Sequence, residues 1–455
     1  MANDLTIGKP ARVILLFSLP LLLSTAIQQL YNIADSIIIG NLDSTDGLAA
    51  IGAAYPITLF YVAIATGSAM GCSVVISQLF GAKKMGELKS AMYTALISFT
   101  ILGAVLALLG FFLAGPILQL MNCNPDAFEN ARIYISIYAL GAFPMLVFNA
   151  ISSIFTGVGD AKRPLIFLII SSVLNVILDI IAVGPLKWGV RGAAIATSFS
   201  QLVAALLSAF ILVRKMCELE AGDDPVVYFS APLLKRIASM AIPSILQQVC
   251  VAIGHCFIQS MVNTFSTSVM AGYEIGSKIV NFIYMCFNTL GTALSSFTGQ
   301  NLGAGKTYRI NSGYRISCII CFAVVAAVVG LVQLFAMPLA GLFMDTSVGD
   351  SAKVLEVAVS FIRIVTLDQF IVSQIIPAGG LLRGLGKIKL FFIATVVDFT
   401  TRVVMTYVLI HALSSINGAY WAWFFGSTID LILLLIFIAY EKKKGILSGQ
   451  GIDQI

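Results

Sequence analysis

The chain has 455 residues, of which 59% are hydrophobic and only 11% are charged, and its mean hydropathy is +0.97. Because this is more apolar surface than the core of a water-soluble fold could bury, lipid must surround most of the chain. The composition therefore excludes a soluble protein, and the positions of the charges decide whether the net charge of +5 marks a surface for nucleic acid or anionic lipid.

Long apolar runs follow one another along the chain, separated by short loops. A helix needs about 20 such residues to cross a hydrocarbon layer about 30 Å thick, and the alternation of an outer-membrane barrel is missing. We therefore predict an all-α membrane protein with twelve transmembrane helices. The predicted spans are 13–39, 49–76, 91–113, 131–156, 164–184, 192–213, 237–263, 269–298, 315–340, 355–380, 391–412 and 418–440.

The basic residues gather on one side of this twelve-span arrangement. The loops that follow even-numbered spans, together with both termini, carry most of the lysines and arginines. The opposite side keeps only Arg132, Lys187, Arg191 and Lys353. By the positive-inside rule both termini are expected in the cytoplasm. We therefore interpret the positive charge as a topology signal and expect no nucleic-acid partner.

The chain contains two similar halves, because landmarks of the first half recur about 222 to 227 residues later. Residues 18–20 resemble 241–243, 77–84 resemble 299–306, 156–162 resemble 383–389, and 192–194 resemble 418–420. Since each half has six spans, both enter the membrane from the same side. We predict two pseudo-symmetric six-helix bundles: an amino-terminal lobe over 1–213, a cytoplasmic linker over 214–236, a carboxyl-terminal lobe over 237–440 and a cytoplasmic tail over 441–455.

Such a duplication is typical of transporters that rock between two states. A duplication with a purely structural role, as in some channels and membrane enzymes, is the alternative at this point.

Two carboxylates of the first half lie at lipid depth, Asp35 in span 1 and Asp179 in span 5. A charge at the centre of a span costs about 2.5–3.5 kcal/mol on insertion scales, so each acid needs a partner or a function. At 1.5 Å per residue both lie roughly 6–8 Å inside the outer ends of their helices and can share one depth. Asn175 precedes Asp179 by four residues and shares its helix face.

These residues predict an oxygen-rich pocket for a proton or a hard monovalent cation. The candidate cation-coupling residues are Asp35, Asn175, Asp179, Thr197, Tyr134 and Asn149. The alternative is that each acid only forms a hydrogen bond with a neighbouring helix.

In the second half, two of the acids within predicted spans have a basic residue four positions later. Glu274 with Lys278 and Asp398 with Arg402 are spaced four apart with the acid first, which predicts two structural ion pairs within helices. By the repeat offset, Arg402 stands where the first half has Asn175. This half is therefore not expected to repeat the cation pocket. Candidates for the lining of a substrate cavity are Gln247, Gln248, Asp368 and Gln369, and Arg363 is a possible partner of Asp368.

Several motifs resemble the multidrug and toxic compound extrusion (MATE) family, most of all its DinF-like bacterial branch. They lie at residues 30–35, 78–82, 156–160, 175–179 and 189–194, and the likeness extends over all twelve spans. The resemblance implies antiport of drugs against H⁺ or Na⁺ by rocking between outward-open and inward-open states. It also implies a bacterial plasma (inner) membrane location.

Carried over residue by residue, the family's cation site, which would hold Na⁺ where Na⁺ is the coupling ion, falls on Asp35, Asn175, Asp179 and Thr197, with Tyr134 and Asn149 nearby. One departure concerns span 7, where some members have a functional acid and this chain has Gln247 and Gln248. Coupling through the second lobe is therefore in doubt.

The sequence thus predicts a secondary multidrug exporter that is not an enzyme, needs no cofactor besides its coupling ion, acts as a monomer and binds small organic compounds within the lipid bilayer. The runner-up is a flippase for lipid-linked saccharide precursors, which would need several unpaired cations for a pyrophosphate. Lys278, Arg363 and Arg402 mostly have an acid nearby. A third class, an intramembrane enzyme, would need Asp35 and Asp179 as catalytic acids.

Overall fold

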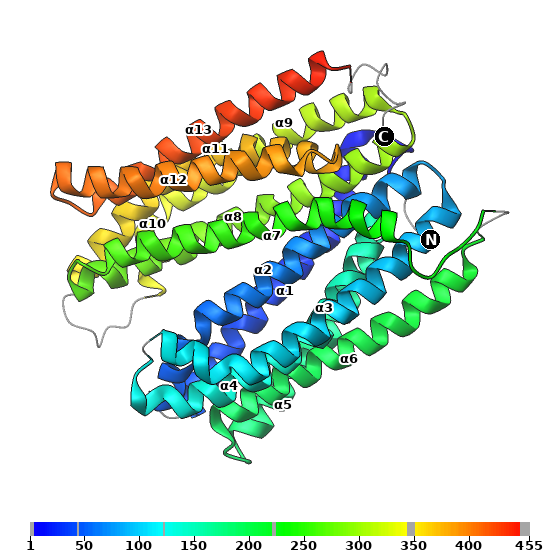
Figure 1. Ribbon diagram of the computed structural model, residues 1–455. Helices are drawn as coiled ribbons and strands as arrows, with labels where there is room; N and C mark the ends of the chain where they lie inside the picture. The colour runs from blue at the N-terminus through cyan, green and yellow to red at the C-terminus, as the bar shows by residue number, and fades with distance from the viewer. Residues whose placement is uncertain (1–3, 43–44, 122, 221–223, 344–350, 446–455) are drawn as a thin grey trace. The chain divides into compact units, whose positions relative to one another are not determined.

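The computed structural model of the protein describes residues 4–42, 45–121, 123–220, 224–343 and 351–445. Its regular structure in these ranges is entirely α-helical, with twelve long helices and one short one (Figure 1). The helices are α1 (Pro10–Leu42), α2 (Thr45–Gly81), α3 (Met85–Leu120), α4 (Pro125–Gly157), α5 (Lys162–Val183), α6 (Gly189–Glu218), α7 (Ala231–Val262), α8 (Thr267–Gly303), α9 (Thr307–Leu334), α10 (Ala336–Gly341), α11 (Ser351–Gly384), α12 (Ile388–Leu413) and α13 (Asn417–Lys443).

Each predicted span overlaps one long helix, and only the ninth also includes a second, short helix, which confirms the predicted fold class. Among the described residues, ten of these helices are long and apolar enough to cross a membrane, and α8 and α11 complete the twelve. The ninth span, predicted as one helix over 315–340, is interrupted at Phe335, between α9 and α10. Pro338 explains the interruption, because a proline ring clashes with the carbonyl group four residues earlier, here that of Leu334.

The chain divides into two compact units. Unit 1 comprises Met1–Asp4 and Leu19–Ile245, and unit 2 comprises Leu5–Ser18 and Leu246–Ile455. The division therefore falls inside α1 and inside α7, close to a proline in each helix, Pro20 and Pro243. Helix α6 extends to Glu218 and α7 begins at Ala231, so both ends of the predicted linker 214–236 are helical, while residues 221–223 lie outside the described residues. Of the predicted tail 441–455, only residues 441–445 are described.

The same helix pairs pack in both units. In unit 1, α4 packs against α2, α3 and α6, and α5 packs against α6. In unit 2, α11 packs against α8, α9 and α13, and α12 packs against α13. Since α11 is the tenth span and α4 the fourth, these are the pairs that a six-span repeat requires, and the predicted pseudo-symmetry is confirmed.

Residues 5–18 belong to unit 2, where the end of α8 and the start of α9 bind the backbone of residues 5–8. Arg309 Nη1 donates a hydrogen bond to the carbonyl oxygen of Gly8 at 2.8 Å, and Asn301 Nδ2 donates one to that of Leu5 at 3.2 Å. Leu5 is only 1% exposed. The other side chains that bind this segment are Gln300 and Lys306.

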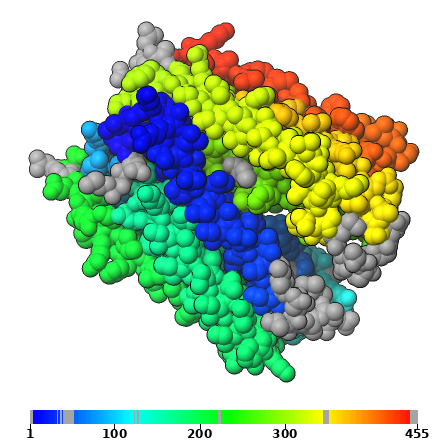
Figure 2. Space-filling view, turned by 180° about the vertical axis from the view of Figure 1, so that it is seen from behind, coloured from blue at the N-terminus to red at the C-terminus, as the bar shows by residue number. Residues whose placement is uncertain are grey.

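From Leu15 onward, α1 has an exposed face. Figure 2 shows the helix in blue at the surface, and leucine side chains are exposed between residues 15 and 30. These are Leu15, Leu16, Leu19, Leu23 and Leu30. An apolar outer face of this kind is what a helix needs where its neighbours are lipid chains, and it accords with the composition.

Candidate functional site

Asp35 of α1 and Asp179 of α5 lie next to each other inside unit 1, with their carboxyl groups within reach of a hydrogen bond should one of them carry a proton. Asp179 is fully buried. Within the described part of the chain, neither oxygen of Asp179 accepts a hydrogen bond, and Oδ1 of Asp35 does not either. Two ionised carboxylates only accept hydrogen bonds and repel each other, so a proton on one of them, or a cation beside them, would stabilise this arrangement.

Asn175 and Thr197 adjoin the two acids. The amide nitrogen of Asn175 donates to Thr197 Oγ1 at 3.3 Å, which joins α5 to α6, and Asn175 also lies beside Asp179. The amide oxygen of Asn175 is buried and has no donor among the described residues. It therefore adds a further acceptor on the same side as the carboxylates, and the structure brings Asp35, Asn175, Asp179 and Thr197 together.

Three tyrosines surround this group. Tyr134 of α4 stacks on Tyr138 with ring centroids 6.0 Å apart, and it lies within electrostatic range of both acids. Tyr31 of α1 contacts Thr197. Tyr134 was predicted from the sequence, whereas Tyr31 and Tyr138 were missed. The signal that could have identified them is spacing, since Tyr31 lies four residues before Asp35 and Tyr138 four after Tyr134.

Asn149 does not join the other candidates. Its amide nitrogen donates to the carbonyl oxygen of Met145 on its own helix at 2.9 Å. At 1.5 Å per residue, Asn149 lies about 22 Å along α4 from Tyr134. The predicted grouping overlooked this rise, because two residues of one span were assigned to a site that only one depth of the helix can reach.

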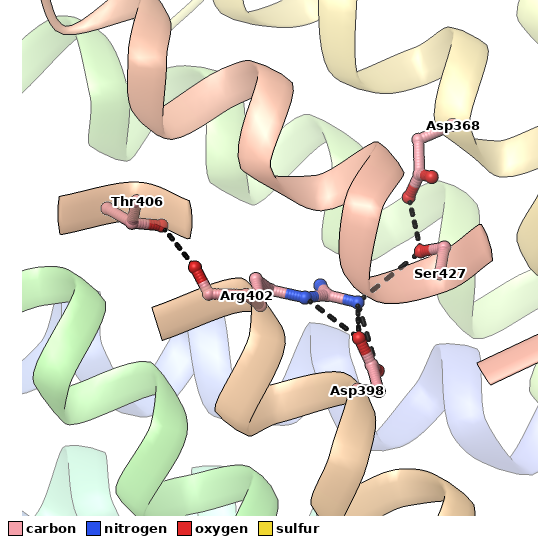
Figure 3. A network of polar contacts seen from close by, with 5 residues as sticks. All are labelled: Asp368, Asp398, Arg402, Thr406 and Ser427. Carbon is pink, nitrogen blue, oxygen red and sulfur yellow. Dashed lines mark hydrogen bonds and ion pairs between the residues drawn. The ribbon is translucent and has the colours of Figure 1, made fainter. Parts of the chain in front are cut away.

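Unit 2 contains a different polar network (Figure 3). Arg402 of α12 donates to both oxygens of Asp398, with distances of 2.9 and 3.1 Å from Nη2. The same nitrogen lies 3.4 Å from Ser427 Oγ on α13, and Ser427 Oγ donates to Asp368 Oδ2 on α11 at 3.0 Å. The predicted ion pair between Asp398 and Arg402 is therefore present, and it is linked to Asp368 through a hydroxyl group.

The candidates for a substrate cavity are mostly interior residues of unit 2. Asp368 and Gln369 are 0% and 1% exposed. Gln247 is buried and donates to Thr395 Oγ1 at 3.0 Å, whereas Gln248 is half-buried. Substrate contact at these four residues stays a prediction, and for Asp368 and Gln369 it would require a rearrangement that exposes them.

Two of the predicted contacts in unit 2 are wrong. No ion pair joins Glu274 to Lys278, and both side chains are exposed. Arg363 is also exposed, and the hydrogen-bond partner of Asp368 is Ser427 instead. An exposed pair at this spacing contributes only about 0.3–0.5 kcal/mol, which is too little to fix two long side chains in one geometry.

Comparison with known proteins gives the same assignment as the fold. The MatE family model matches residues 20–181 and 243–408, one match in each half of the chain. A curated FAD transporter of Shewanella oneidensis is 30% identical over 73% of this chain and 74% of its own. The probable multidrug resistance protein NorM of Thermotoga maritima is 22% identical and covers 96% of this chain and 94% of its own.

Solved structures agree. One is described as the outward-facing conformation of a multidrug resistance MATE family transporter of the MOP superfamily. It matches with a TM-score of 0.89 and 25% identity over 99% of this chain and 98% of that one. Because the family model matches most of each six-helix half, the chain belongs to the MatE family of membrane transporters.

Proposed function

We propose that the protein is a secondary active multidrug efflux antiporter, which exports organic and often cationic compounds in exchange for H⁺ or Na⁺. Relatives named as multidrug resistance or multidrug export proteins in Thermotoga maritima and Staphylococcus haemolyticus support the export of drugs. The observation that carries the ion coupling is the pairing of Asp35 and Asp179 side by side.

The coupling follows from the charge of that pair. Two unit charges about 4 Å apart repel by roughly 4 kcal/mol at an effective dielectric constant of 20. A bound proton or cation removes the repulsion, and its release restores it, so the occupancy of the pair can bias one conformation over another. An ion gradient across the membrane would then drive the cycle by loading the pair on one side and unloading it on the other.

H⁺ and Na⁺ use this pocket differently. A proton needs only one carboxyl oxygen, whereas Na⁺, as a hard cation, favours several oxygen ligands. The acceptors without donors on Asp35, Asp179 and Asn175, together with the hydroxyl of Thr197, could supply them. We therefore keep both ions in the proposal, with Asp35, Asn175, Asp179 and Thr197 as the ligands should Na⁺ be the coupling ion.

The remaining parts of the proposal concern the transport cycle. The two lobes, 1–213 and 237–440, rock about the linker 214–236, so that the substrate has access from one side of the membrane at a time. Both termini lie in the cytoplasm of a bacterial cell, and the protein acts as a monomer in the plasma membrane. No cofactor besides the coupling ion takes part, and no covalent chemistry occurs.

Proteoliposomes test this proposal directly. Purified protein is reconstituted, a fluorescent organic cation is added, and a pH gradient or a Na⁺ gradient is imposed separately. One of the two gradients should accelerate dye movement at least tenfold, and Asp35→Asn should abolish the acceleration. Glu356→Gln is the matched control, because Glu356 forms an exposed ion pair with Lys353. Dye movement that responds to neither gradient would exclude the proposal.

The flippase remains the second candidate because of an observation in unit 2. Lys278 and Arg363 are exposed and form no ion pair with any described residue, so they are free to bind phosphate groups. The Shewanella relative is named for FAD, a compound that contains a pyrophosphate. Vesicles that contain a fluorescent polyprenyl pyrophosphate distinguish the two functions: translocation of this lipid without any ion gradient would favour the flippase.

A further inference from the structure

Unit 2 contains a buried acid cluster that the proposed antiport does not use. Asp368, Asp398 and Asp430 come from α11, α12 and α13 and are 0%, 6% and 4% exposed, and Arg402, the cation beside them, is 5% exposed. We propose that this cluster is a second proton-binding site and that Asp430 is the residue that carries the proton. The proposal goes beyond the antiport mechanism, because it does not depend on Asp35 or Asp179.

The charges of the cluster do not balance if all three acids are ionised. Arg402 binds Asp398 through both carboxylate oxygens, so these two form a neutral pair. The guanidinium group also stacks on Trp423, 4.5 Å from the ring centroid, which keeps it in place. Asp368 and Asp430 then remain as two negative charges in a dry interior. An uncompensated buried charge costs several kcal/mol, so the cluster requires at least one bound proton.

The hydrogen bonds indicate which acid holds that proton. Asp368 accepts a hydrogen bond from Ser427 Oγ, and this hydroxyl in turn faces Arg402. The arginine charge therefore reaches Asp368 through Ser427 and stabilises its ionised form. Asp430 lies within electrostatic range of Arg402 but accepts no hydrogen bond from a described residue, whereas Asp368, whose Oδ1 is also buried without a partner, keeps the bond from Ser427 at Oδ2. Asp430 is consequently the acid that binds a proton.

The groups around Asp430 favour a proton over Na⁺. Asp398 and Arg402 face it from α12, and Tyr284 of α8 lies within electrostatic range. A sodium ion favours several oxygen ligands, but the oxygens of Asp398 are already bound to Arg402, whose positive charge would repel a metal ion. A proton needs one oxygen only, and the free acceptor on Asp430 provides it.

Helix α13 also packs closely against the carboxylate of Asp398. A Cβ atom at Gly426 of α13 would lie 2.2 Å from Oδ1 of Asp398. The absence of a side chain there lets α13 approach the carboxylate and close the space around it. Ser427 and Asp430 follow on the same helix, three residues apart, and so share a face. Helix α13 thus supplies both the hydroxyl that serves Asp368 and the acid that receives the proton.

Infrared spectroscopy tests the proposal without any transport measurement. The C=O stretching band of protonated carboxylic acids is recorded for purified full-length protein over a range of pH. Asp430→Asn should remove one carboxylic acid from this band, and the loss should persist in a background that carries Asp35→Asn and Asp179→Asn. Glu356→Gln should leave the band unchanged.

Two further arms keep the test decisive. Asp430→Glu retains an acid and should shift the band rather than remove it, which gives a result even if the asparagine variant does not fold. Addition of NaCl at constant pH should leave the band intact. A spectrum of Asp430→Asn or Asp430→Glu identical to that of the unmodified protein would overturn the proposal, and so would a band that Na⁺ removes. Because no gradient is used, failure here is distinct from failure of the antiport.

Discussion

Gly426 of α13 lies directly against Asp398 of α12, so that a Cβ atom at this glycine would be 2.2 Å from the carboxylate oxygen Oδ1 and 3.2 Å from the Cβ atom of Arg402. The buried ion pair of unit 2 therefore depends on a position without a side chain. Helix packing and electrostatics are therefore linked here, because a side chain added at residue 426 must displace either α13 or the carboxylate of Asp398.

The first prediction follows from this contact. Gly426→Ala should destabilise the protein by about 1–3 kcal/mol, the usual cost of overpacking a core. Thermal unfolding of the purified protein in detergent measures the effect. Gly330→Ala is the matched control, since nothing lies within 4 Å of a Cβ atom there, and this variant should be neutral or slightly stabilising. Equal melting temperatures for both variants would contradict the model of close packing.

The second prediction concerns the ion pair itself. Arg402→Met alone should cost about 3–5 kcal/mol, because it leaves Asp398 as an unpaired buried charge. Combining it with Asp398→Leu should recover most of the loss, since a buried pair can be replaced by apolar residues at little cost. Thermal unfolding of the two single variants and the double variant gives the coupling, and additive losses would exclude a mutual pair.

The third prediction concerns the acids of unit 1. Asp35→Asn and Asp179→Asn should each reduce gradient-driven efflux at least tenfold, and the double variant should be no worse than either single variant, because both residues serve one ion. The measurement is dye efflux from proteoliposomes under the gradient that drives it. Losses that multiply in the double variant would show that the acids act separately.

The fourth prediction tests the position of Asn149. Because this residue lies about 22 Å along α4 from Tyr134 and binds the backbone of its own helix, Asn149→Ala should change the dependence of efflux on ion gradient less than twofold. Asn175→Ala should have a much larger effect, since Asn175 adjoins Asp179. A similar loss in both variants would return Asn149 to the ion pathway.

The sequence could predict the helices because lipid leaves few choices. A chain that crosses a hydrocarbon layer must satisfy its backbone within each span, so long apolar runs become helices almost regardless of their neighbours. The break at Phe335 was missed because the residues before it are as apolar as those in any other span. Pro338 did not reveal the break, because a proline is tolerated in the first turn of a helix, and the sequence does not show that a new helix begins at Ala336.

Side-chain partners were harder to predict, as two pairs with identical spacing demonstrate. Asp398 and Arg402 form an ion pair, whereas Glu274 and Lys278 do not. The spacing of four residues brings both pairs within reach of an ion pair. Only the buried pair forms one, and whether a pair is buried depends on which other helices pack against its helix. Ser427 was missed for the same reason, since nothing near it in the sequence reveals that Asp368 of α11 lies beside it.

The anchoring of the first residues in unit 2 has a consequence for biosynthesis. Leu5 donates its backbone N–H to Gln300, a partner 295 residues further along the chain. At about 5–20 residues per second, a ribosome needs roughly 15 to 60 s to make that stretch. Throughout that time the segment around Leu5 has no docking place, so it stays at the membrane surface while the seven helices α1 to α7 insert, exposed to chaperones or proteases. Nascent chains stalled before α8 should therefore be cleaved readily at their beginning, and chains that extend past α9 should be protected.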